Sequence, residues 1–134
     1  MPLNYTSALV AIAAPNFDRL VNFYQALLTQ EPTVYTPNIY AEFQLPGVKL
    51  GIYRPKTNSK LKTQNISCGD ATRTKLKTSI SLCLEVSDLE AAIAYLTELG
   101  YPLSGEILTA SHGKEIYAYD PDGNRLILHQ AIDR

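Results

Sequence analysis

Two stretches in the C-terminal half of the sequence carry side chains suited to acid–base chemistry. "SISLCLEV", residues 79–86, contains Glu85, and "KEIYAYDPDGNRLILHQ", residues 114–130, contains Glu115 and His129. General acid–base catalysis needs a group that titrates near neutral pH, most often histidine, and neighbouring carboxylates orient or tune it. These three residues are the candidate catalytic groups, with hydrogen-bonded structural roles as the alternative.

The other soft or nucleophilic side chains carry little chemical signal. Cys68 and Cys83 form neither a disulfide framework nor a Cys-x-x-Cys metal motif. Cys83 lies in an apolar run and is predicted to be a small buried hydrophobe, and Cys68 is predicted to be an inert loop thiol. His112 lies in "SHGK", a predicted hairpin turn facing solvent.

Length and composition restrict the class of protein. A chain of 134 residues with 46% apolar and 19% charged residues is typical of one globular domain. The net charge of −1 gives no overall attraction to nucleic acid or anionic membrane. No apolar run is long enough to cross a bilayer, and "SALVAIAAP" is too short for a signal peptide. We expect a cytoplasmic protein without nucleic-acid or membrane partners.

Apolar periodicity predicts two amphipathic helices. The first follows Asn16 as N-cap, and the second follows Asp88 and ends at Gly100. A short apolar strand precedes each helix, and three strand-like runs follow it. The predicted strands are "ALVAIAA" (8–14), "TVY" (33–35), "IYAEFQL" (39–45), "VKLGIY" (48–53), "SISLCLEV" (79–86), "PLSGEILT" (102–109), "KEIYAY" (114–119) and "RLILHQ" (125–130).

The same βαβββ pattern therefore occurs twice. The helices match at an offset of 72 residues, and "FQLPGVKLGIY" (43–53) matches "YDPDGNRLILH" (119–129) at an offset of 76. One helix on one sheet leaves the other face bare, so two units are expected to pair. We expect one α+β domain over 1–134, with module one at 5–54, a basic linker at 55–78 and module two at 79–130.

The predicted linker is strongly basic. With Arg54 it holds seven of the twelve basic side chains and one acid, Asp70. It contains no aromatic residue, which argues against single-stranded nucleic acid as its partner. A solvated crossover is the first interpretation, and a basic flap over a binding site is the alternative.

The two repeats, the helix beginning "DLEAA" (88–92) and the "DPDGN" turn (120–124) together resemble the vicinal oxygen chelate superfamily. That superfamily contains glyoxalase I, fosfomycin- and bleomycin-resistance proteins and extradiol dioxygenases. The resemblance extends over residues 5–130. It implies two modules forming a curved, barrel-like mixed sheet with the helices on its outer face, and a homodimer.

Catalytic members of that superfamily hold a divalent metal with His, Gln or Glu from the first and fourth strands of each module. The corresponding positions here are Leu9, Gly51, Ser81 and Ile127. None offers a metal ligand, and His129, two residues past Ile127, cannot hold a catalytic metal alone. The resemblance therefore predicts no metal, no cofactor and no metal-dependent lyase or dioxygenase activity.

Period-two alternation from these positions predicts which side chains share one space. They are Leu9, Ala11, Phe43, Lys49, Gly51, Tyr53, Ser81, Cys83, Glu85, Glu115, Tyr117, Tyr119, Arg125, Ile127 and His129. An apolar and aromatic lining with few polar groups is typical of a small-molecule pocket, although tyrosine also favours strands by propensity alone. The predicted ligand-binding residues are Phe43, Tyr53, Ser81, Cys83, Tyr117, Tyr119, Arg125, Ile127 and His129.

Three functions remain open. The first is a metal-free protein that binds a partly aromatic small molecule in the cavity of the curved sheet. The second is an enzyme that uses His129, Glu85 or Glu115 for metal-independent acid–base chemistry. The third is an interaction module whose cavity is filled by its own side chains. Gly51 and Ser81 leave room for a ligand, whereas Leu9 and Ile127 favour a filled cavity.

Overall fold

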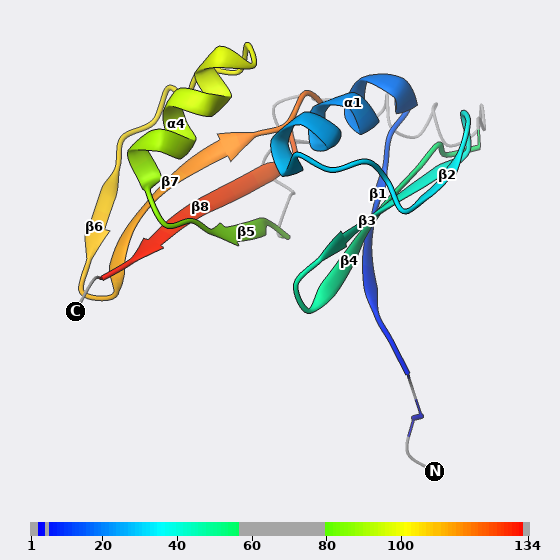
Figure 1. The fold of residues 1–134 in the computed structure, drawn as a ribbon, viewed down its shortest axis with the longest axis horizontal. Helices are drawn as coiled ribbons and strands as arrows, with labels where there is room; N and C mark the ends of the chain where they lie inside the picture. Colours follow the sequence, from blue (N-terminus) through cyan, green and yellow to red (C-terminus); the bar gives the residue numbers. More distant parts are fainter. Residues whose placement is uncertain (1–2, 5, 57–79, 133–134) are drawn as a thin grey trace, which may run out of the picture. The chain divides into compact units, whose positions relative to one another are not determined.

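The computed structural model describes residues 3–4, 6–56 and 80–132, which belong to two compact units, 1–57 and 58–134. Both units have the order βαβββ, and the described residues form one four-stranded mixed sheet in each (Figure 1). The α+β class and the repeat are thereby confirmed. Barrel-like curvature stays a prediction, and all of the basic linker except Pro55 and Lys56 lies outside the described residues.

The first unit contains five elements. They are β1 (Leu9–Ala13), α1 (Phe17–Leu28), β2 (Val34–Thr36), β3 (Tyr40–Leu45) and β4 (Val48–Tyr53). The strand order is β1-β4-β3-β2, with β1 parallel to β4 and the other pairs antiparallel. The parallel pair follows from the helical crossover between β1 and the hairpin.

The second unit repeats this order. Its elements are β5 (Leu82–Glu85), α4 (Leu89–Glu98), β6 (Leu108–Ala110), β7 (Gly113–Tyr119) and β8 (Arg125–Ala131). The strand order is β5-β8-β7-β6, with β5 parallel to β8. The strand predicted over 102–109 is reduced to β6, because Pro102 donates no backbone hydrogen bond and Gly105 favours irregular backbone.

Both helices begin where the sequence predicts. The Asn16 side chain accepts a hydrogen bond of 3.2 Å from Arg19 N, and the Asp88 side chain accepts one of 3.1 Å from Ala91 N. These bonds satisfy amides that have no partner within the first helical turn. Gly100, with φ of +99°, follows the end of α4. The N-caps therefore fix where each helix leaves its first strand.

One face of each sheet is buried beneath its helix. In the first unit, α1 packs on β4, and the core includes Phe17, Leu20, Tyr24, Leu50 and Ile52. In the second unit, α4 packs on β8, and the core includes Leu89, Leu96, Ile116, Leu126 and Leu128. Because side chains alternate along a strand, the remaining strand residues point to the opposite face.

The "DPDGN" turn is closed by its own first residue. The Asp120 carboxylate, whose residue is 4% exposed, accepts hydrogen bonds from Asp122 N at 2.9 Å, Asn124 N at 2.9 Å and Asn124 Nδ2 at 2.8 Å. Gly123 takes a positive φ of +88° that favours glycine. The motif therefore fixes the start of β8 and the side-chain alternation that follows.

The length of this turn also changes the predicted match between the third strands of the two modules. Gln44 faces Lys49 across the first hairpin and Tyr119 faces Arg125 across the second, so the third strands match at an offset of 75 rather than 76. The second turn is one residue longer. Phe43 lies in the helix-covered core with 0% exposure, so the offset of 76 that placed it among the predicted ligand-binding residues does not hold for the third strands.

Replacing Phe43 tests this register. Phe43→Ala should lower the free energy of unfolding by about 3–5 kcal/mol, because it leaves a cavity in a closed core. Gln44→Ala, on the exposed neighbour, should change it by less than about 0.5 kcal/mol. Urea denaturation of both variants provides the measurement, and equal effects would contradict the assigned register.

Candidate functional site

The face of the second sheet opposite α4 forms a surface that we call the open face. Cross-strand pairing arranges its side chains in rows. Tyr119 lies opposite Arg125 in the first row. Tyr117, Ile127 and Cys83 form the second row, and Glu115, His129 and Glu85 form the third. A basic end, an apolar middle and an acidic end with one histidine therefore follow one another along the strands.

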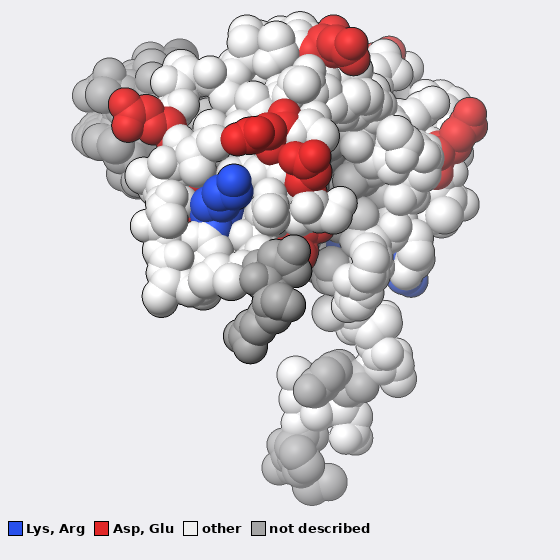
Figure 2. Space-filling model, turned by 60° about the vertical axis from the view of Figure 1, so that its left-hand side comes forward, with Lys and Arg blue, Asp and Glu red and all other residues white. Residues whose placement is uncertain are grey.

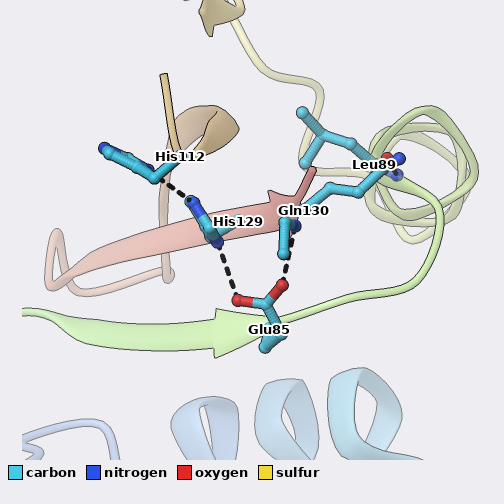
Figure 3. A network of polar contacts seen from close by, with 6 residues as sticks. Glu85, Leu89, His112, His129 and Gln130 are labelled. Atoms are coloured by element: carbon cyan, nitrogen blue, oxygen red, sulfur yellow. Dashed lines mark hydrogen bonds and ion pairs between the residues drawn. The ribbon is translucent and has the colours of Figure 1, made fainter. Parts of the chain in front are cut away.

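The third row contains a hydrogen-bonded network (Figure 3). Glu85 Oε1 lies 2.7 Å from His129 Nδ1, and Glu85 Oε2 accepts a 2.8 Å bond from Ala131 N. His129 Nε2 lies 3.1 Å from His112 Nδ1. Because a carboxylate can only accept, Nδ1 of His129 carries the proton, and in the neutral His129 ring Nε2 accepts from His112 Nδ1.

Glycine permits the last contact. Gly113 has φ of +143°, and a Cβ built there would collide with the Gln130 carbonyl oxygen and lie 3.1 Å from His129 Nε2. His112 was predicted to be a solvent-facing turn residue; it is exposed but reaches back to His129. The pairing of Gly113 with Ala131, which brings His112 near the end of β8, could not be read from the short motif "SHGK".

The network lowers the pKa of the Glu85 carboxyl group. The hydrogen bond from His129 outweighs desolvation and, together with the bond from Ala131 N, holds the pKa of Glu85 below its ordinary value. Glu85 is therefore a carboxylate acceptor that orients His129. Glu115 lies opposite His129 on the neighbouring strand.

Gln130 makes a different contact. Its side-chain oxygen accepts a 2.7 Å bond from Leu89 N in the first turn of α4 (Figure 3). This bond ties the helix start to β8 and satisfies an amide that the helix leaves open.

The first row is organised around Arg125. Its Nε donates a 2.8 Å hydrogen bond to Ser81 Oγ, and its guanidinium carbon lies 5.2 Å from the centroid of the Tyr117 ring. That separation is within the range of a cation–π contact. Ser81 and Tyr117 thus hold the guanidinium at the sheet surface, next to Tyr119 on β7.

A hollow of about 450 Å³ adjoins the two tyrosines. It is lined by residues 100–105, Tyr117 and Tyr119. β6 pairs with β7 only from Gly113 to Glu115, so the loop after α4 rather than a strand flanks the second half of β7. The hollow therefore lies where a strand extending over 102–107 would have paired with β7.

Cys83 differs from its prediction. It is exposed on the open face rather than buried. Partial desolvation, followed by the negative charges of Glu115 and Glu85, raises the pKa of its thiol. A protonated thiol is a poor nucleophile, so Cys83 offers a contact surface rather than a reactive group. Cys68 lies outside the described residues.

The first unit has an equivalent bare face with different contents. Tyr40 donates a 2.8 Å bond to Glu42 Oε1, and Lys49 Nζ lies 3.7 Å from Glu42 Oε2. Burial, then Glu42, raises the pKa of Tyr40. A Cβ on Gly51 would lie 2.7 Å from Tyr40 Oη and 3.2 Å from Leu9 Cδ1. The side chains of Tyr40 and Leu9 therefore occupy the space beside Gly51.

A family model for the glyoxalase/bleomycin resistance protein/dioxygenase superfamily matches residues 6–128. The chain belongs to this superfamily. No curated protein matches the sequence. Solved structures with the same fold include a glyoxalase/bleomycin resistance protein from Catenulispora acidiphila, with 21% identity and a TM-score of 0.64, covering 96% of this chain and 100% of that one.

Two further superfamily structures show the breadth of the fold. A glyoxalase/bleomycin resistance protein/dioxygenase family enzyme from Burkholderia phytofirmans has a TM-score of 0.70 at 12% identity and covers 93% of this chain and 98% of that one. A bleomycin resistance determinant encoded on the transposon Tn5 has a TM-score of 0.63 at 18% identity and covers 95% and 98%. At these identities the likeness concerns the fold alone.

Two of the predicted metal positions carry side chains with apolar or aromatic neighbours. Ile127 lies between Cys83 and Tyr117 in the second row, and Gly51 lies against Tyr40 and Leu9. Within the described parts of the chain, no group of three or more His, Cys, Asp or Glu is arranged to hold a metal ion. The metal-free character of the protein stays a prediction from the residue types at Leu9, Gly51, Ser81 and Ile127.

Acidic side chains are more conspicuous than basic ones on the face in Figure 2. This agrees with the excess of acids outside residues 54–78. Among the described residues, no helix combines the length and apolar character needed to cross a membrane.

The Glu85–His129 pair predicts a pH-dependent stability. Because the pKa of Glu85 is lower in the folded state, its contribution is complete above the unfolded carboxyl pKa and is lost as pH falls through the folded value. The stability difference between the wild type and Glu85→Gln should therefore shrink over that acidic window. Urea denaturation from about pH 3 to pH 7 measures it.

A double-mutant cycle supplies the control. In a His129→Phe background the largest cause of the shift is gone, so adding Glu85→Gln should have a smaller pH-dependent effect. An unchanged effect in that background would contradict the proposed coupling.

Proposed function

We propose that this superfamily member is a metal-free small-molecule-binding protein. Its ligand is partly aromatic and contacts the open face of the second sheet beside the 100–105 loop. The observation that carries the proposal is the hollow of about 450 Å³ lined by that loop, Tyr117 and Tyr119.

The hollow has suitable dimensions and chemistry. Its volume falls within the roughly 300–1,000 Å³ range of small-molecule pockets. Tyr117 is 38% exposed and Tyr119 is 51% exposed, so both rings offer uncovered aromatic surface. Tyrosine provides a flat apolar face and a hydroxyl at little conformational cost, which favours binding of planar groups.

The other predicted contacts extend this surface. Ser81, Cys83, Arg125, Ile127 and His129 continue the open face from the two tyrosines. Tyr53 is 41% exposed on the equivalent face of the first sheet and remains a proposed contact. The metal-free character rests on the residue types at Leu9, Gly51, Ser81 and Ile127, since none supplies a metal ligand.

A homodimer is also proposed. β1 lies at the edge of its sheet and pairs only with β4 among the described strands. Leu9 is 44% exposed and Val10 is 38% exposed on that strand. An edge strand with exposed apolar side chains is suited to being covered by another polypeptide.

Metal-independent acid–base catalysis is the second candidate function. The observation that favours it is the chain from Glu85 through His129 to His112. Glu85 fixes the proton on His129 Nδ1 and so directs the His129 lone pair outward along the chain. His129 Nε2 then faces His112 Nδ1 at 3.1 Å.

The third candidate is an interaction protein whose cavity is filled by its own side chains. Only the first of the two repeated units supports it. Tyr40 and Leu9 fill the space beside Gly51 in the first unit. The hollow beside Tyr117 and Tyr119 is an opening that such a module does not need.

The binding proposal predicts where a neutral aromatic probe acts. Titration of ¹⁵N-labelled protein with naphthalene-2-methanol should shift the amide resonances of residues 100, 101, 103–105, 117 and 119. Tyr117→Leu/Tyr119→Leu should weaken this binding by about tenfold, the loss expected when aromatic stacking worth about 1.4 kcal/mol is removed.

Tyr35→Leu is the matched control, because Tyr35 is also exposed but lies on β2 of the first unit. It should leave the affinity unchanged. Equal affinity of the double variant and the wild type, with both folded by circular dichroism, would contradict the proposed site.

A further inference from the structure

The repeat places one basic residue at the same position of both modules, but with different neighbours. Lys49 and Arg125 both stand near the start of the fourth strand, opposite Gln44 and Tyr119 respectively. The next side chain on the same face of the third strand, two positions earlier in the sequence, is Glu42 in the first module and Tyr117 in the second. The geometry is shared, whereas the neighbouring side chain differs.

This difference changes how each positive charge is balanced. In the first module, the Glu42 carboxylate lies 3.7 Å from Lys49 Nζ and supplies the counter-charge. In the second module, the Tyr117 ring lies beneath the Arg125 guanidinium at 5.2 Å. Within the described residues, no carboxylate forms an ion pair with Arg125. Lys49 is neutralised inside its own sheet, and Arg125 is not.

The hydrogen bonding of Arg125 leaves donors for a ligand. A guanidinium has five N–H donors, and Ser81 Oγ accepts from Nε at 2.8 Å. The hydrogen bond to Ser81 and the contact with Tyr117 restrict the side chain without using the terminal nitrogens. Those nitrogens form the planar fork that binds a carboxylate or sulfonate through two parallel hydrogen bonds.

The fork lies beside the aromatic surface of the hollow. Arg125 stacks on Tyr117 and is the cross-strand neighbour of Tyr119, and both tyrosines line the hollow. The acids of the open face, Glu85 and Glu115, are in the third row with His129, two rows away from Arg125. An anionic group is therefore favoured at the Arg125 end of the face and disfavoured at the other end.

We propose that Arg125 is the anion-binding residue of the ligand site and that the ligand is an aromatic acid. Its anionic group pairs with the Arg125 guanidinium, and its ring lies against Tyr117 and Tyr119 in the hollow. This inference rests on the proposed binding function and adds the charge class of the ligand to it.

Three probes with the same ring and different charge test the inference. They are 2-naphthoate, naphthalene-2-methanol and naphthalen-2-ylmethylammonium, each titrated into ¹⁵N-labelled full-length protein at low salt. The wild type should bind naphthoate about tenfold more tightly than the alcohol, because a charge-assisted hydrogen bond replaces a neutral contact. The ammonium probe should bind most weakly. Added salt should reduce the preference for naphthoate.

Two variants locate the preference. Arg125→Gln should reduce the ratio of the naphthoate affinity to the alcohol affinity from about ten to about one. Lys49→Gln, the change at the repeat-equivalent position, should bind all three probes as the wild type does. Arg125→Lys should retain part of the preference, since an ammonium supplies charge without the planar fork. Unfolding temperatures check that each variant is folded.

The possible failures are distinct. If the alcohol binds at residues 100–105 but naphthoate is not preferred, or if Arg125→Gln keeps the preference, the aromatic-acid inference is overturned and the binding function stands. If none of the three probes shifts these resonances, both the binding function and this inference are overturned.

Discussion

The organisation of this protein depends on the alternation of side chains along strands that carry one helix per sheet. A single helix covers one face of a four-stranded sheet, so residues such as Leu126 and Leu128 are buried while Ile127 and His129 point away from it. A strand cannot change this assignment without moving every apolar side chain to the wrong face. The bare face is therefore a necessary product of the fold, and its chemistry is free to vary.

The bare faces of the two modules carry different side-chain contacts. The first has closed its bare face with local contacts, in which Tyr40 occupies the space beside Gly51 and Glu42 approaches Lys49. The second keeps an arginine on a tyrosine at one end and a Glu85–His129–His112 network at the other. Superfamily membership explains the shared scaffold, whereas the contacts on the two bare faces differ between the modules.

Much of the fold was predictable because its signals are local. The N-caps Asn16 and Asp88, the helical apolar spacing and the "DPDGN" turn each depend on nearby residues, and all are confirmed. The errors concern strand register, strand length and strand pairing, which depend on residues that are distant in the sequence. One extra residue in the second turn changes the offset between the third strands from 76 to 75, so the repeat matched Phe43 to the wrong residue, whereas Phe43 itself lies in the core. Pro102 shortens a predicted strand into a loop that borders the hollow. The contact between His112 and His129 depends on pairing between β7 and β8, which no short motif encodes.

Native mass spectrometry of the purified full-length protein, combined with elemental analysis of the same sample, tests the central claim most directly. The claim is that the open face serves a small organic ligand without a metal. The expected result is a dimer without a stoichiometric divalent metal that gains the mass of 2-naphthoate when the acid is added. A tightly bound divalent metal at one ion per chain would contradict the prediction that Leu9, Gly51, Ser81 and Ile127 leave the protein without a metal site. It would favour a metal-dependent activity instead.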